Sequence, residues 1–373
     1  MSDLFIGLMS GTSLDGVDGV LCRFEPELQV LAHQSLAFDP ALREELLALN
    51  TPGAAQAAGG ELHRAALAGN ALARCYALAV HALLETTRTQ PSEVCAIGAH
   101  GQTVRHQPGQ FDGQGYTLQL NAPALLAELA GIDVVADLRS RDVAAGGQGA
   151  PLVPAFHAAA FGRGDASLAV LNVGGISNLS VLDPGYPVRG FDCGPGNGLM
   201  DHWCRLHTGQ PYDAQGAWAA GGRVLPALLQ AALADPFFGL PPPKSTGRDL
   251  FNAPWLDALL AAQPPVAPRD VQATLCELTA ASCVADLRRH ARRASELIVC
   301  GGGALNTELM RRLRVAAGPV KVVSSADRGL PPLQVEATAF AWLARAHMQR
   351  QPGNLASVTG ALGPRILGAL YPA

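Results

Sequence analysis

The sequence predicts an α/β protein built from two similar halves. Apolar, strand-like segments alternate along the chain with helical segments rich in Ala and Leu. Each half opens with the same pattern, a strand followed by a glycine turn and a returning strand. The chain has 373 residues, of which 49% are apolar and 16% are charged, so it can form two domains with cores of their own. Global disorder is excluded.

The first half opens with strands over residues 5–9 and 17–21, on either side of the polar turn Gly11-Thr-Ser-Leu-Asp-Gly16. The composition then predicts helices over 41–49, 61–86 and 123–129, and strands over 94–99, 116–120 and 133–137. A polar, glycine-rich segment over 139–151 follows. We therefore expect domains over residues 1–140 and 141–373.

The second half repeats this opening, because an apolar run over 168–173 turns at Gly174-Gly175 and returns over 177–182. A strand over 297–300 runs into Gly301-Gly302-Gly303, and another strand is predicted over 321–323. Helices are predicted over 199–207, 224–234, 271–293, 306–317 and 334–349, and a proline-rich loop over 236–249.

Composition excludes several classes of function. The net charge of −4 and the isoelectric point near 6.2 do not provide the basic surface that nucleic-acid binding needs, or a polybasic membrane anchor. No run of 18 consecutive apolar residues occurs, and the first residues do not resemble a signal peptide. The eight cysteines form no C-x-x-C pair, which is typical of buried free thiols in a reducing compartment. We therefore expect a cytoplasmic protein.

The glycine turns are the first candidate site. Neither hairpin turn enters a helix, and no P-loop pattern occurs, so the Rossmann and Walker arrangements are excluded. Two hairpins can still present backbone N–H groups to phosphate oxygens. Each hairpin alone could equally be an ordinary turn with glycine at positive φ. The third glycine run, Gly301 to Gly303, favours phosphate binding for the set.

Acids beside the first turn suggest a cation. Thr12 and Ser13 can donate hydrogen bonds to phosphates, whereas Asp15 and Asp18 cannot approach phosphates without a cation such as Mg²⁺. The alternative for Asp15 is that its carboxylate only caps the turn.

Asp192 precedes a glycine–proline turn, in a run with no other charge between Arg189 and Asp201. A carboxylate in such a setting could act as a general base. It could also be the N-cap of the helix that follows. Both interpretations stay open at this point.

Further polar residues could bind a substrate. Arg139, Arg141 and Asp142 precede a glycine-rich run and could bind an anion, although an exposed salt bridge is the commoner arrangement. His100 could line a cleft or be a structural histidine. Glu336 is the single acid on an otherwise apolar helix and could face a polar site or solvent.

Seven motifs in order resemble the signature of the anhydro-N-acetylmuramic acid kinase family, and the resemblance extends to Thr359-Gly-Ala-Leu-Gly-Pro364, over essentially the whole chain. The motifs are Gly7-Leu-Met-Ser-Gly-Thr-Ser-Leu-Asp-Gly-Val-Asp18, Gly98-Ala-His-Gly-Gln-Thr103, Val143-Ala-Ala-Gly-Gly-Gln-Gly-Ala-Pro151, Asn172-Val-Gly-Gly175, Gly190 to Asn197, Lys244-Ser-Thr-Gly-Arg248 and Cys300-Gly-Gly-Gly303.

The resemblance implies the actin-like ATPase architecture of the sugar kinase, actin and heat-shock-chaperone superfold. This architecture has two RNase H-like domains, each with a mixed sheet flanked by helices, and the nucleotide in the interdomain cleft. The last helical segment is then expected to return to the first domain. The resemblance also implies that ATP contacts Gly11, Thr12, Ser13, Leu14, Asp15, Gly16, Val17, Asp18, Gly174, Gly175, Gly301, Gly302 and Gly303.

Asp192 matches the catalytic aspartate of the family, and Arg139, Arg141 and Glu336 fall at positions associated with the sugar. One departure is Leu138, where the family has Phe before the first arginine; this change concerns packing.

The implied reaction uses ATP and Mg²⁺ to open 1,6-anhydro-N-acetylmuramic acid with water while phosphorylating its 6-oxygen, in peptidoglycan recycling and amino-sugar catabolism. The expected partners are these small molecules and a second copy in a homodimer, with no nucleic acid and no membrane. The alternatives are a kinase of another sugar and a non-enzymatic, actin-like ATP switch.

Overall fold

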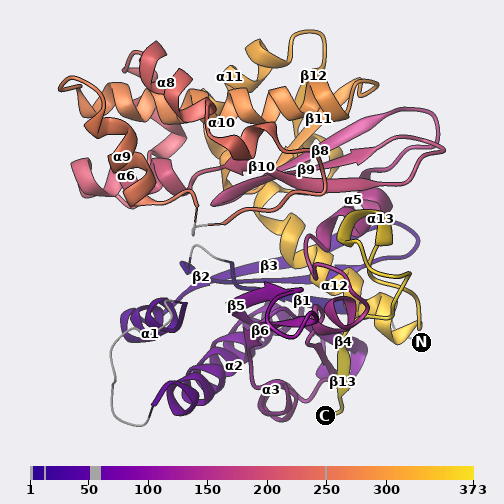
Figure 1. The fold of residues 1–373 in the computed structure, drawn as a ribbon. Coiled ribbons are helices and arrows are strands. Elements are labelled where there is room, and N and C mark those ends of the chain that lie inside the picture. The colour runs from indigo at the N-terminus through magenta and orange to yellow at the C-terminus, as the bar shows by residue number, and fades with distance from the viewer. Residues whose placement is uncertain (1–2, 12–13, 51–59, 248–249) are drawn as a thin grey trace. The chain divides into compact units, whose positions relative to one another are not determined.

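The computed structural model describes residues 3–11, 14–50, 60–247 and 250–373, and it divides the chain into two compact units (Figure 1). Unit 1 comprises Met1–Ala160 and Gln334–Ala373, and unit 2 comprises Phe161–Leu333. The predicted boundary at 140/141 therefore falls inside unit 1. The reason is a buried hydrogen-bond network, because the Asp142 carboxylate accepts from Asn354 Nδ2 (2.6 Å) and Thr359 Oγ1 (2.7 Å) and so ties this segment to the end of the chain.

Unit 1 contains a mixed sheet in the order β13-β7-β4-β1-β2-β3. β1, β2 and β3 are antiparallel neighbours, whereas β4 is parallel to β1 and β7 is parallel to β4. The strands of this sheet are β1 (Leu4–Met9), β2 (Gly16–Arg23), β3 (Gln29–Ala37), β4 (Val94–Ala99), β7 (Val134–Ala136) and β13 (Ala369–Tyr371). A separate hairpin pairs β5 (Gln102–Pro108) with β6 (Gly115–Leu120).

The helices in this part of the chain are α1 (Pro40–Asn50), α2 (Gly60–Thr87), α3 (Pro123–Ala130), α4 (Ser140–Ala144), α5 (Val153–Phe161), α12 (Val335–Met348) and α13 (Ala356–Thr359). Of these helices, α2, α3 and α12 contact this sheet. Helix α12 lies unusually close to the sheet. Gly7 of β1 and Gly98 of β4 are paired in register, and a side chain at either position would collide with the α12 backbone at Ala337 or Phe340. These two glycines therefore set the position of α12 and of Glu336 in its first turn.

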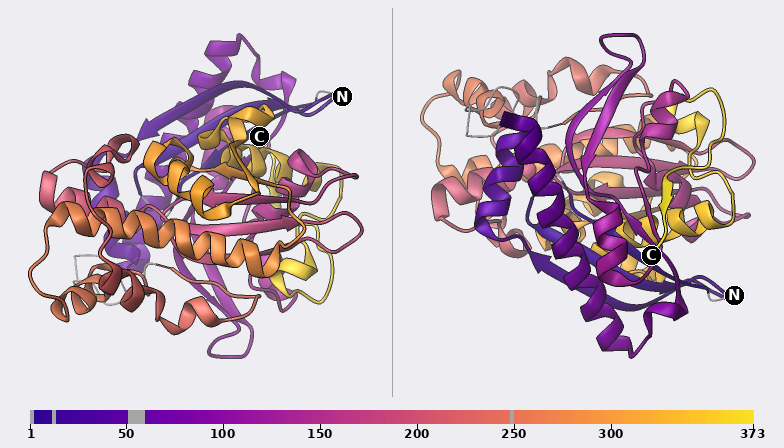
Figure 2. Two further views of the ribbon diagram at one scale, coloured as in Figure 1. Left: turned by 90° about the horizontal axis from the view of Figure 1, so that it is seen from above. Right: turned by 90° about the horizontal axis from the view of Figure 1, so that it is seen from below.

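Helix α2 is long and apolar enough to cross a membrane by length and composition, although 56% of its most apolar window is buried inside the protein. Its buried side chains, among them Leu72, Tyr76 and Leu83, belong to the core of unit 1. The helix contacts β2 and β3, and its ribbon runs across the strands of this sheet in Figure 2 (right). The helix is thus the core helix of its unit.

Unit 2 repeats the arrangement with a sheet in the order β10-β9-β8-β11-β12. Here too the first three strands are antiparallel, and β11 is parallel to both β8 and β12. The strands are β8 (Leu168–Val173), β9 (Ile176–Leu182), β10 (Arg189–Pro195), β11 (Glu296–Cys300) and β12 (Lys321–Ser324). The helices are α6 (Gly198–Thr208), α7 (Ala217–Ala220), α8 (Pro226–Leu233), α9 (Ala253–Ala261), α10 (Pro268–His290) and α11 (Thr307–Ala317), with α10 lying along the sheet (Figure 2, left).

Short 3₁₀ segments, from both units, cover Pro91–Glu93, Ala214–Gly216, Pro236–Gly239, Gly302–Leu305, Ser325–Arg328 and Pro332–Gln334.

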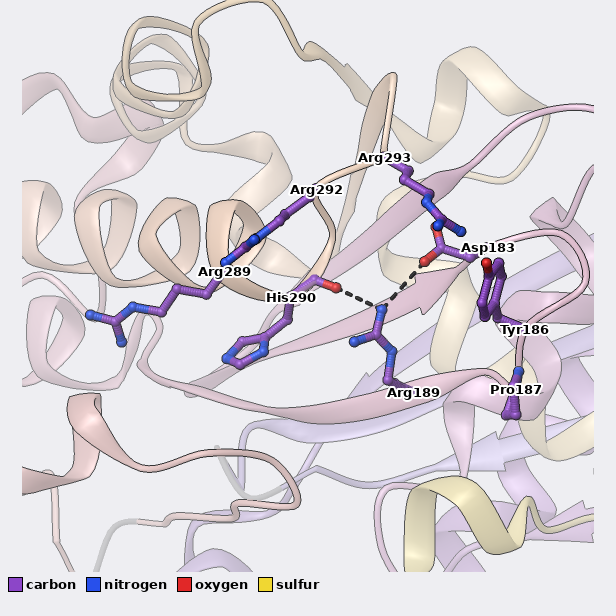
Figure 3. Close-up of a pocket in the computed structure, with 8 residues that line it drawn as sticks. All are labelled: Asp183, Tyr186, Pro187, Arg189, Arg289, His290, Arg292 and Arg293. Atoms are coloured by element: carbon purple, nitrogen blue, oxygen red, sulfur yellow. Dashed lines mark hydrogen bonds and ion pairs between the residues drawn. The ribbon is translucent and has the colours of Figure 1, made fainter.

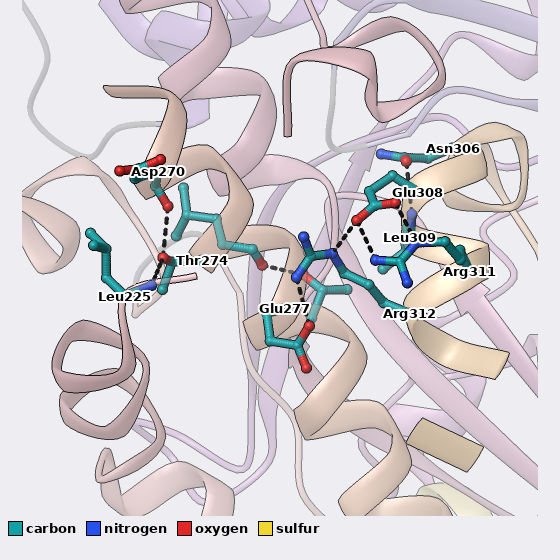
Figure 4. A network of polar contacts seen from close by, with 11 residues as sticks. Leu225, Asp270, Thr274, Glu277, Asn306, Glu308, Leu309, Arg311 and Arg312 are labelled. Atoms are coloured by element: carbon teal, nitrogen blue, oxygen red, sulfur yellow. Dashed lines mark hydrogen bonds and ion pairs between the residues drawn. The ribbon is translucent and has the colours of Figure 1, made fainter. Parts of the chain in front are cut away.

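Helices α10 and α11 are joined by a polar network (Figure 4). The buried Arg312 donates to Glu308 Oε1 (2.8 Å) on its own helix and to Glu277 Oε2 (2.7 Å) on α10. Asn306 caps α11, because its Oδ1 accepts from Leu309 N–H (3.0 Å). The network fixes α11 against α10 where the chain leaves the Gly301 to Gly303 run.

Five strands of the unit 1 sheet, β7-β4-β1-β2-β3, match the order of the five strands of unit 2, and β13 is an additional edge strand in unit 1. The expected pair of RNase H-like, mixed sheets flanked by helices is confirmed. The first two strands predicted in each half correspond to β1 and β2 and to β8 and β9, with bounds close to those predicted. Sequence analysis missed the strands β3, β5, β10 and β13 and the helices α4, α5, α7, α9 and α13. It interpreted residues 190–197 as the approach to a helix, whereas they belong largely to β10. All eight cysteines are free, and Cys75 and Cys95 are the two that are only partly buried.

Candidate active site

In unit 2, the hairpin turn at Gly174-Gly175 contacts the start of α6. The Gly174 oxygen accepts from Asn197 N–H (2.7 Å), and the Gly175 oxygen accepts from the N–H groups of Gly196 (2.9 Å) and Gly198 (3.1 Å). A side chain at Gly196 would collide with the Gly174 oxygen. By contrast, a methyl group at Gly174 would lie 3.7 Å from its nearest neighbour, the Ile176 oxygen, so a side chain would fit there without collision.

The Gly301 to Gly303 run packs on the same end of β8. Gly301 has φ of +75°, and a side chain there would collide with Asn172 Oδ1, while one at Gly303 would collide with Val173. Asn197 Nδ2 donates to the Val173 oxygen (3.1 Å). The structure therefore brings together three glycine segments of unit 2, two of which the sequence predicted to contact nucleotide.

Asp192 lies in the middle of β10, where it pairs with Asn178 of β9. The N-cap of α6 is Asn197, so the interpretation of Asp192 as a helix cap is wrong. Its carboxylate accepts from Thr246 N–H (2.9 Å) and from Ser245 Oγ (3.2 Å). Burial raises the pKa of Asp192 from 3.8 to about 6, against the opposing effects of Thr246, Ser245 and the Lys244 charge. A carboxyl group with this pKa can take up and release a proton near neutral pH.

In unit 1, the first glycine turn is anchored at its start and at its end. Ser10 Oγ donates to the Gly101 oxygen (3.0 Å), and Leu14 N–H donates to the Gly11 oxygen (3.2 Å) with Leu14 at φ of +57°. Gly16 lies so close to the backbone at Leu36 that a side chain would collide with it. The predicted contacts Thr12 and Ser13 lie outside the described residues.

The two acids near this turn have different surroundings. Asp15 is exposed, and its main-chain oxygen accepts from Phe38 N–H (3.2 Å). Asp18 lies in β2, where its Oδ1 accepts from Ser35 Oγ and lies 3.3 Å from His33 Nε2. Val17, between them in sequence, is buried in the core.

Arg139 is held by an unprotonated histidine. Its Nε and Nη2 lie 3.1 and 3.0 Å from His100 Nε2, and its Nη1 donates to the Gly149 oxygen (2.8 Å). Burial, aided by the Arg139 charge, lowers the pKa of His100 to about 3, so its Nε2 accepts. His100 Nδ1 then donates to the Ser10 oxygen (3.3 Å). One histidine therefore connects Arg139 with the first glycine turn.

The charge of Arg139 persists in these surroundings. Burial lowers its pKa to about 10, and the charges of Glu336 and Asp142 oppose that effect, so the guanidinium stays protonated at neutral pH. His106, another neighbour of Arg139, has its pKa lowered to about 4 by burial and by that charge. Arg139 thus lies among neutral imidazoles and within the field of two acids.

The structure separates the remaining predicted residues by environment. Glu336 is partly buried and electrostatically close to Arg139, whereas Arg141 is exposed on α4. Asp142 is fully buried and accepts from Gly149 N–H (2.7 Å), so the interpretation of this segment as an exposed salt bridge is wrong for Asp142.

Sequence reasoning missed the groups that hold Asp192. Ser245 and Thr246 lie in the Lys244-Ser-Thr-Gly-Arg248 motif, which carried weight only as part of the family resemblance. Their spacing from Asp192 gives no local signal, because the contact joins segments more than fifty residues apart.

A cavity of about 460 Å³ in unit 2 lies beside the turn between β9 and β10 (Figure 3). It is lined by Asp183, Tyr186, Pro187, Arg189, Arg289, His290, Arg292 and Arg293. Arg189 Nη2 already contacts Asp183 Oδ2 (3.3 Å) and the His290 oxygen (2.7 Å), and Arg289 donates to the Phe238 oxygen (2.7 Å). None of the predicted site residues lines it.

The chain matches the model of the family described as anhydro-N-acetylmuramic acid kinase over residues 3–373. It is 63% identical to the anhydro-N-acetylmuramic acid kinase of Variovorax paradoxus, over 100% of this chain and 99% of that protein. The proteins of the same name from Albidiferax ferrireducens and Bordetella pertussis are 61% and 60% identical, over 100% and 99% of this chain and 100% and 96% of theirs.

Among solved structures, the activator of the 2-hydroxyisocaproyl-CoA dehydratase from Clostridium difficile with bound ADPNP superposes with a TM-score of 0.48 and 10% identity, over 93% of this chain and 96% of that chain. The identities and coverages of the curated relatives, together with the family match over nearly every residue, show the family. The chain belongs to the anhydro-N-acetylmuramic acid kinase family.

Proposed function

We propose that Asp192 is the general base of the family's reaction, the ATP-dependent opening of 1,6-anhydro-N-acetylmuramic acid with phosphorylation of its 6-oxygen. The observation that supports this role is the environment of its carboxyl group. Burial raises the pKa of Asp192 to about 6, and the group lies on β10 four residues before Gly196, which packs on the Gly174 turn. A base is most effective when its pKa lies near the working pH.

In the proposed step, the Asp192 carboxylate accepts a proton from a water molecule as the water oxygen bonds to C1 of the sugar. The C1–O6 bond breaks, and O6 bonds to the γ-phosphorus of ATP. The bond from that phosphorus to the bridging oxygen breaks, and ADP leaves with its electron pair. The products are N-acetylmuramate 6-phosphate and ADP, and the proton on Asp192 passes to solvent. Thr246 N–H and Ser245 Oγ keep the carboxylate oriented throughout.

The glycine segments are proposed to bind the nucleotide phosphates. A side chain at Gly174 would meet no close contact, so its backbone is not crowded by protein atoms on that side. Gly301 and Gly303 pack tightly against Asn172 and Val173, and this packing holds their loop beside the end of β8. Gly302 lies between them. In unit 1, the turn from Gly11 to Asp18 is proposed to contact nucleotide phosphates through its backbone and hydroxyl groups.

The donor set beside the first turn fits Mg²⁺, since Asp15 offers an exposed carboxylate and Asp18 a partly exposed one. Mg²⁺ at these oxygens would neutralise phosphate charge during transfer. Asp15 and Asp18 would hold it, and the neighbouring backbone donors would orient the phosphate oxygens.

Arg139, Arg141 and Glu336 are proposed to bind the sugar. Arg139 offers a guanidinium whose charge persists, which suits the carboxylate of the muramic acid lactyl group. Glu336 can accept a hydrogen bond from a sugar hydroxyl.

The family places the enzyme in peptidoglycan recycling. We further propose that the enzyme is a cytoplasmic homodimer whose ligands are these small molecules, with no role for nucleic acid or membrane.

The direct test combines the purified chain with ATP, Mg²⁺ and a panel of sugars in ¹⁸O-labelled water. We expect ADP and a sugar 6-phosphate with the anhydro sugar alone, and label at its anomeric carbon. Phosphorylation of an ordinary sugar without label would support a conventional sugar kinase. ATP hydrolysis that no sugar stimulates would support a switch protein instead. Neither alternative is favoured by the family match.

A further inference from the structure

Lys244 and Asp286 form a buried ion pair behind the proposed base. Lys244 Nζ lies 2.8 Å from Asp286 Oδ2, and their side chains are only 1% and 3% exposed. Asp286 belongs to α10, which packs on the sheet that contains Asp192. The proposed reaction uses neither residue.

The backbone of the Lys244 segment adds to the open edge of β10. β10 is the edge strand of its sheet, and Asp192 N–H donates to the Lys244 oxygen (3.0 Å). Two residues later, Thr246 N–H donates back to the Asp192 carboxylate. The segment from Lys244 to Thr246 is therefore bonded both to the main-chain N–H of Asp192 and to its carboxylate.

The buried Lys244 side chain also holds this segment in place. Its ammonium group lies 4.8 Å from the centre of the Phe237 ring, in addition to its contact with Asp286. A buried ammonium without a partner is costly, so the segment is held where Lys244 can reach Asp286. Without the ion pair, the segment would be held at Asp192 by the bond from Asp192 N–H to the Lys244 oxygen and by the bonds of Ser245 and Thr246 to the carboxylate.

We propose that the Lys244–Asp286 pair is a positioning device that holds Ser245 and Thr246 against the Asp192 carboxylate and sets its proton affinity. This proposal rests on the role of Asp192 as the base. Buried ion pairs contribute little net stability compared with apolar packing, so a role in fixing geometry gives a physical reason for this one. Lys244 also supplies positive charge close enough to favour the ionised carboxylate.

Other titratable groups face the pair. On β10, Cys193 points to the side of α10, where burial raises its thiol pKa and Cys283 and Asp286 add to that effect. On α10, His290 Nε2 lies 3.8 Å from Asp286 Oδ1, and burial lowers its pKa. Arg189 and Arg289, drawn beside His290 in Figure 3, add positive charge there. The pH profile of a variant at position 244 has to be interpreted with these groups in view.

The test compares Lys244→Met with a matched control, Arg312→Met. Arg312 also forms a buried ion pair in unit 2, with Glu308 on α11, but has no contact with Asp192. We expect Lys244→Met to lower kcat by about tenfold or more, because misplaced catalytic groups cost that much, with the KM for ATP within about twofold of the wild-type value. The acidic limb of its pH profile should move to higher pH, so that the loss is smaller at pH 8 than at pH 6. The control should lower the melting temperature and leave that limb unchanged.

A second measurement keeps this proposal separate from the proposed function. The Asp192 carboxyl titration can be followed by ¹³C NMR with labelled aspartate, and Asp192→Asn assigns its resonance. The titration should move to higher pH in Lys244→Met whether or not the sugar is the true substrate. Should Lys244→Met not fold, Lys244→Met combined with Asp286→Asn removes both buried charges, and the titration should still move to higher pH, by a smaller amount, because Ser245 and Thr246 lose their anchor. A folded variant with a wild-type titration, or with wild-type kcat and pH limb, would overturn the proposal.

Discussion

The two units share the order of five sheet strands, but their polar centres have opposite charge. In unit 1, the chain leaves β4 at His100, which accepts from Arg139, so the centre is cationic. In unit 2, the corresponding strand β11 leads into Gly301 to Gly303, and the polar centre is the Asp192 carboxylate on β10. The comparison shows that one sheet topology can carry different chemistry, which depends on the few residues at and beside its strands.

The electrostatics of the two centres also differ. His100 and His106 have pKa values of about 3 and 4, so neither competes with Arg139 for positive charge at neutral pH. Asp192, in contrast, has a pKa near 6 and changes its charge in the physiological range. The polar centre of unit 1 thus keeps the positive charge of Arg139, whereas Asp192 in unit 2 can exchange a proton near neutral pH.

The largest effect should come from removing the exchangeable proton site. Asp192→Asn keeps the size of the side chain and an oxygen that accepts from Thr246 N–H. We expect kcat to fall by roughly 10²-fold or more, as is typical for the loss of a general base. Calorimetry should show ATP affinity within about threefold of wild type, since ground-state binding is retained. Near-normal turnover would assign the base to another residue.

Changing the fixed charge in unit 1 should affect binding rather than turnover. Arg139→Met removes a charge-assisted contact, typically about 1.5–3 kcal/mol, so the KM for the anhydro sugar should rise about 10- to 100-fold. The KM for ATP in the same variant serves as the control and should stay within about threefold. A tenfold fall in kcat without a change in the KM for the sugar would contradict the assignment of Arg139 to sugar binding and not to turnover.

Two glycines of unit 2 provide a matched pair. Gly301→Ala places a side chain against Asn172 at positive φ and should destabilise the protein by about 1–3 kcal/mol. Gly174→Ala meets no close neighbour and should cost less than about 1 kcal/mol, while weakening ATP binding if this backbone contacts phosphate. Urea unfolding and calorimetry measure the two effects. Equal stability losses would contradict the packing described for Gly301.

The smallest expected effect is the dependence of stability on pH. Folding raises the pKa of Asp192 from 3.8 to about 6, so the ionised carboxylate opposes folding above pH 6 and has no such effect below about pH 4. Wild type should therefore lose about 1 kcal/mol relative to Asp192→Asn between pH 4 and pH 7, a value reduced from the full shift because the side chain is partly exposed. Unfolding curves at both pH values test the sign.

Much of the fold could be predicted because its strongest signals are local. The strands β1, β4, β8 and β11 are short apolar runs that end at glycine or polar residues, and periodicity is sufficient to find them. β3 and β10 were missed because their sequences, with His33 and Ser35 in one and Gly190 and Gly194 in the other, are not apolar runs. Their strand structure comes from pairing with β2 and β9, which is not a local property.

The candidate site could be predicted only in part, for the same reason. Glycine runs and the isolated Asp192 are visible in the sequence. The partners that determine their chemistry are distant, as Thr246 is from Asp192 and His100 is from Arg139. The burial that raises the pKa of Asp192 and lowers that of His100 arises only in the folded chain.

The central claim is that Asp192 is the base, and the pH dependence of kcat/KM for the anhydro sugar tests it most directly. With its pKa near 6, the wild-type rate should fall tenfold per pH unit below about pH 6 and level off above it. The residual activity of Asp192→Asn should lack this limb. A wild-type profile that stays flat down to pH 5, or a limb that persists in Asp192→Asn, would contradict the assignment.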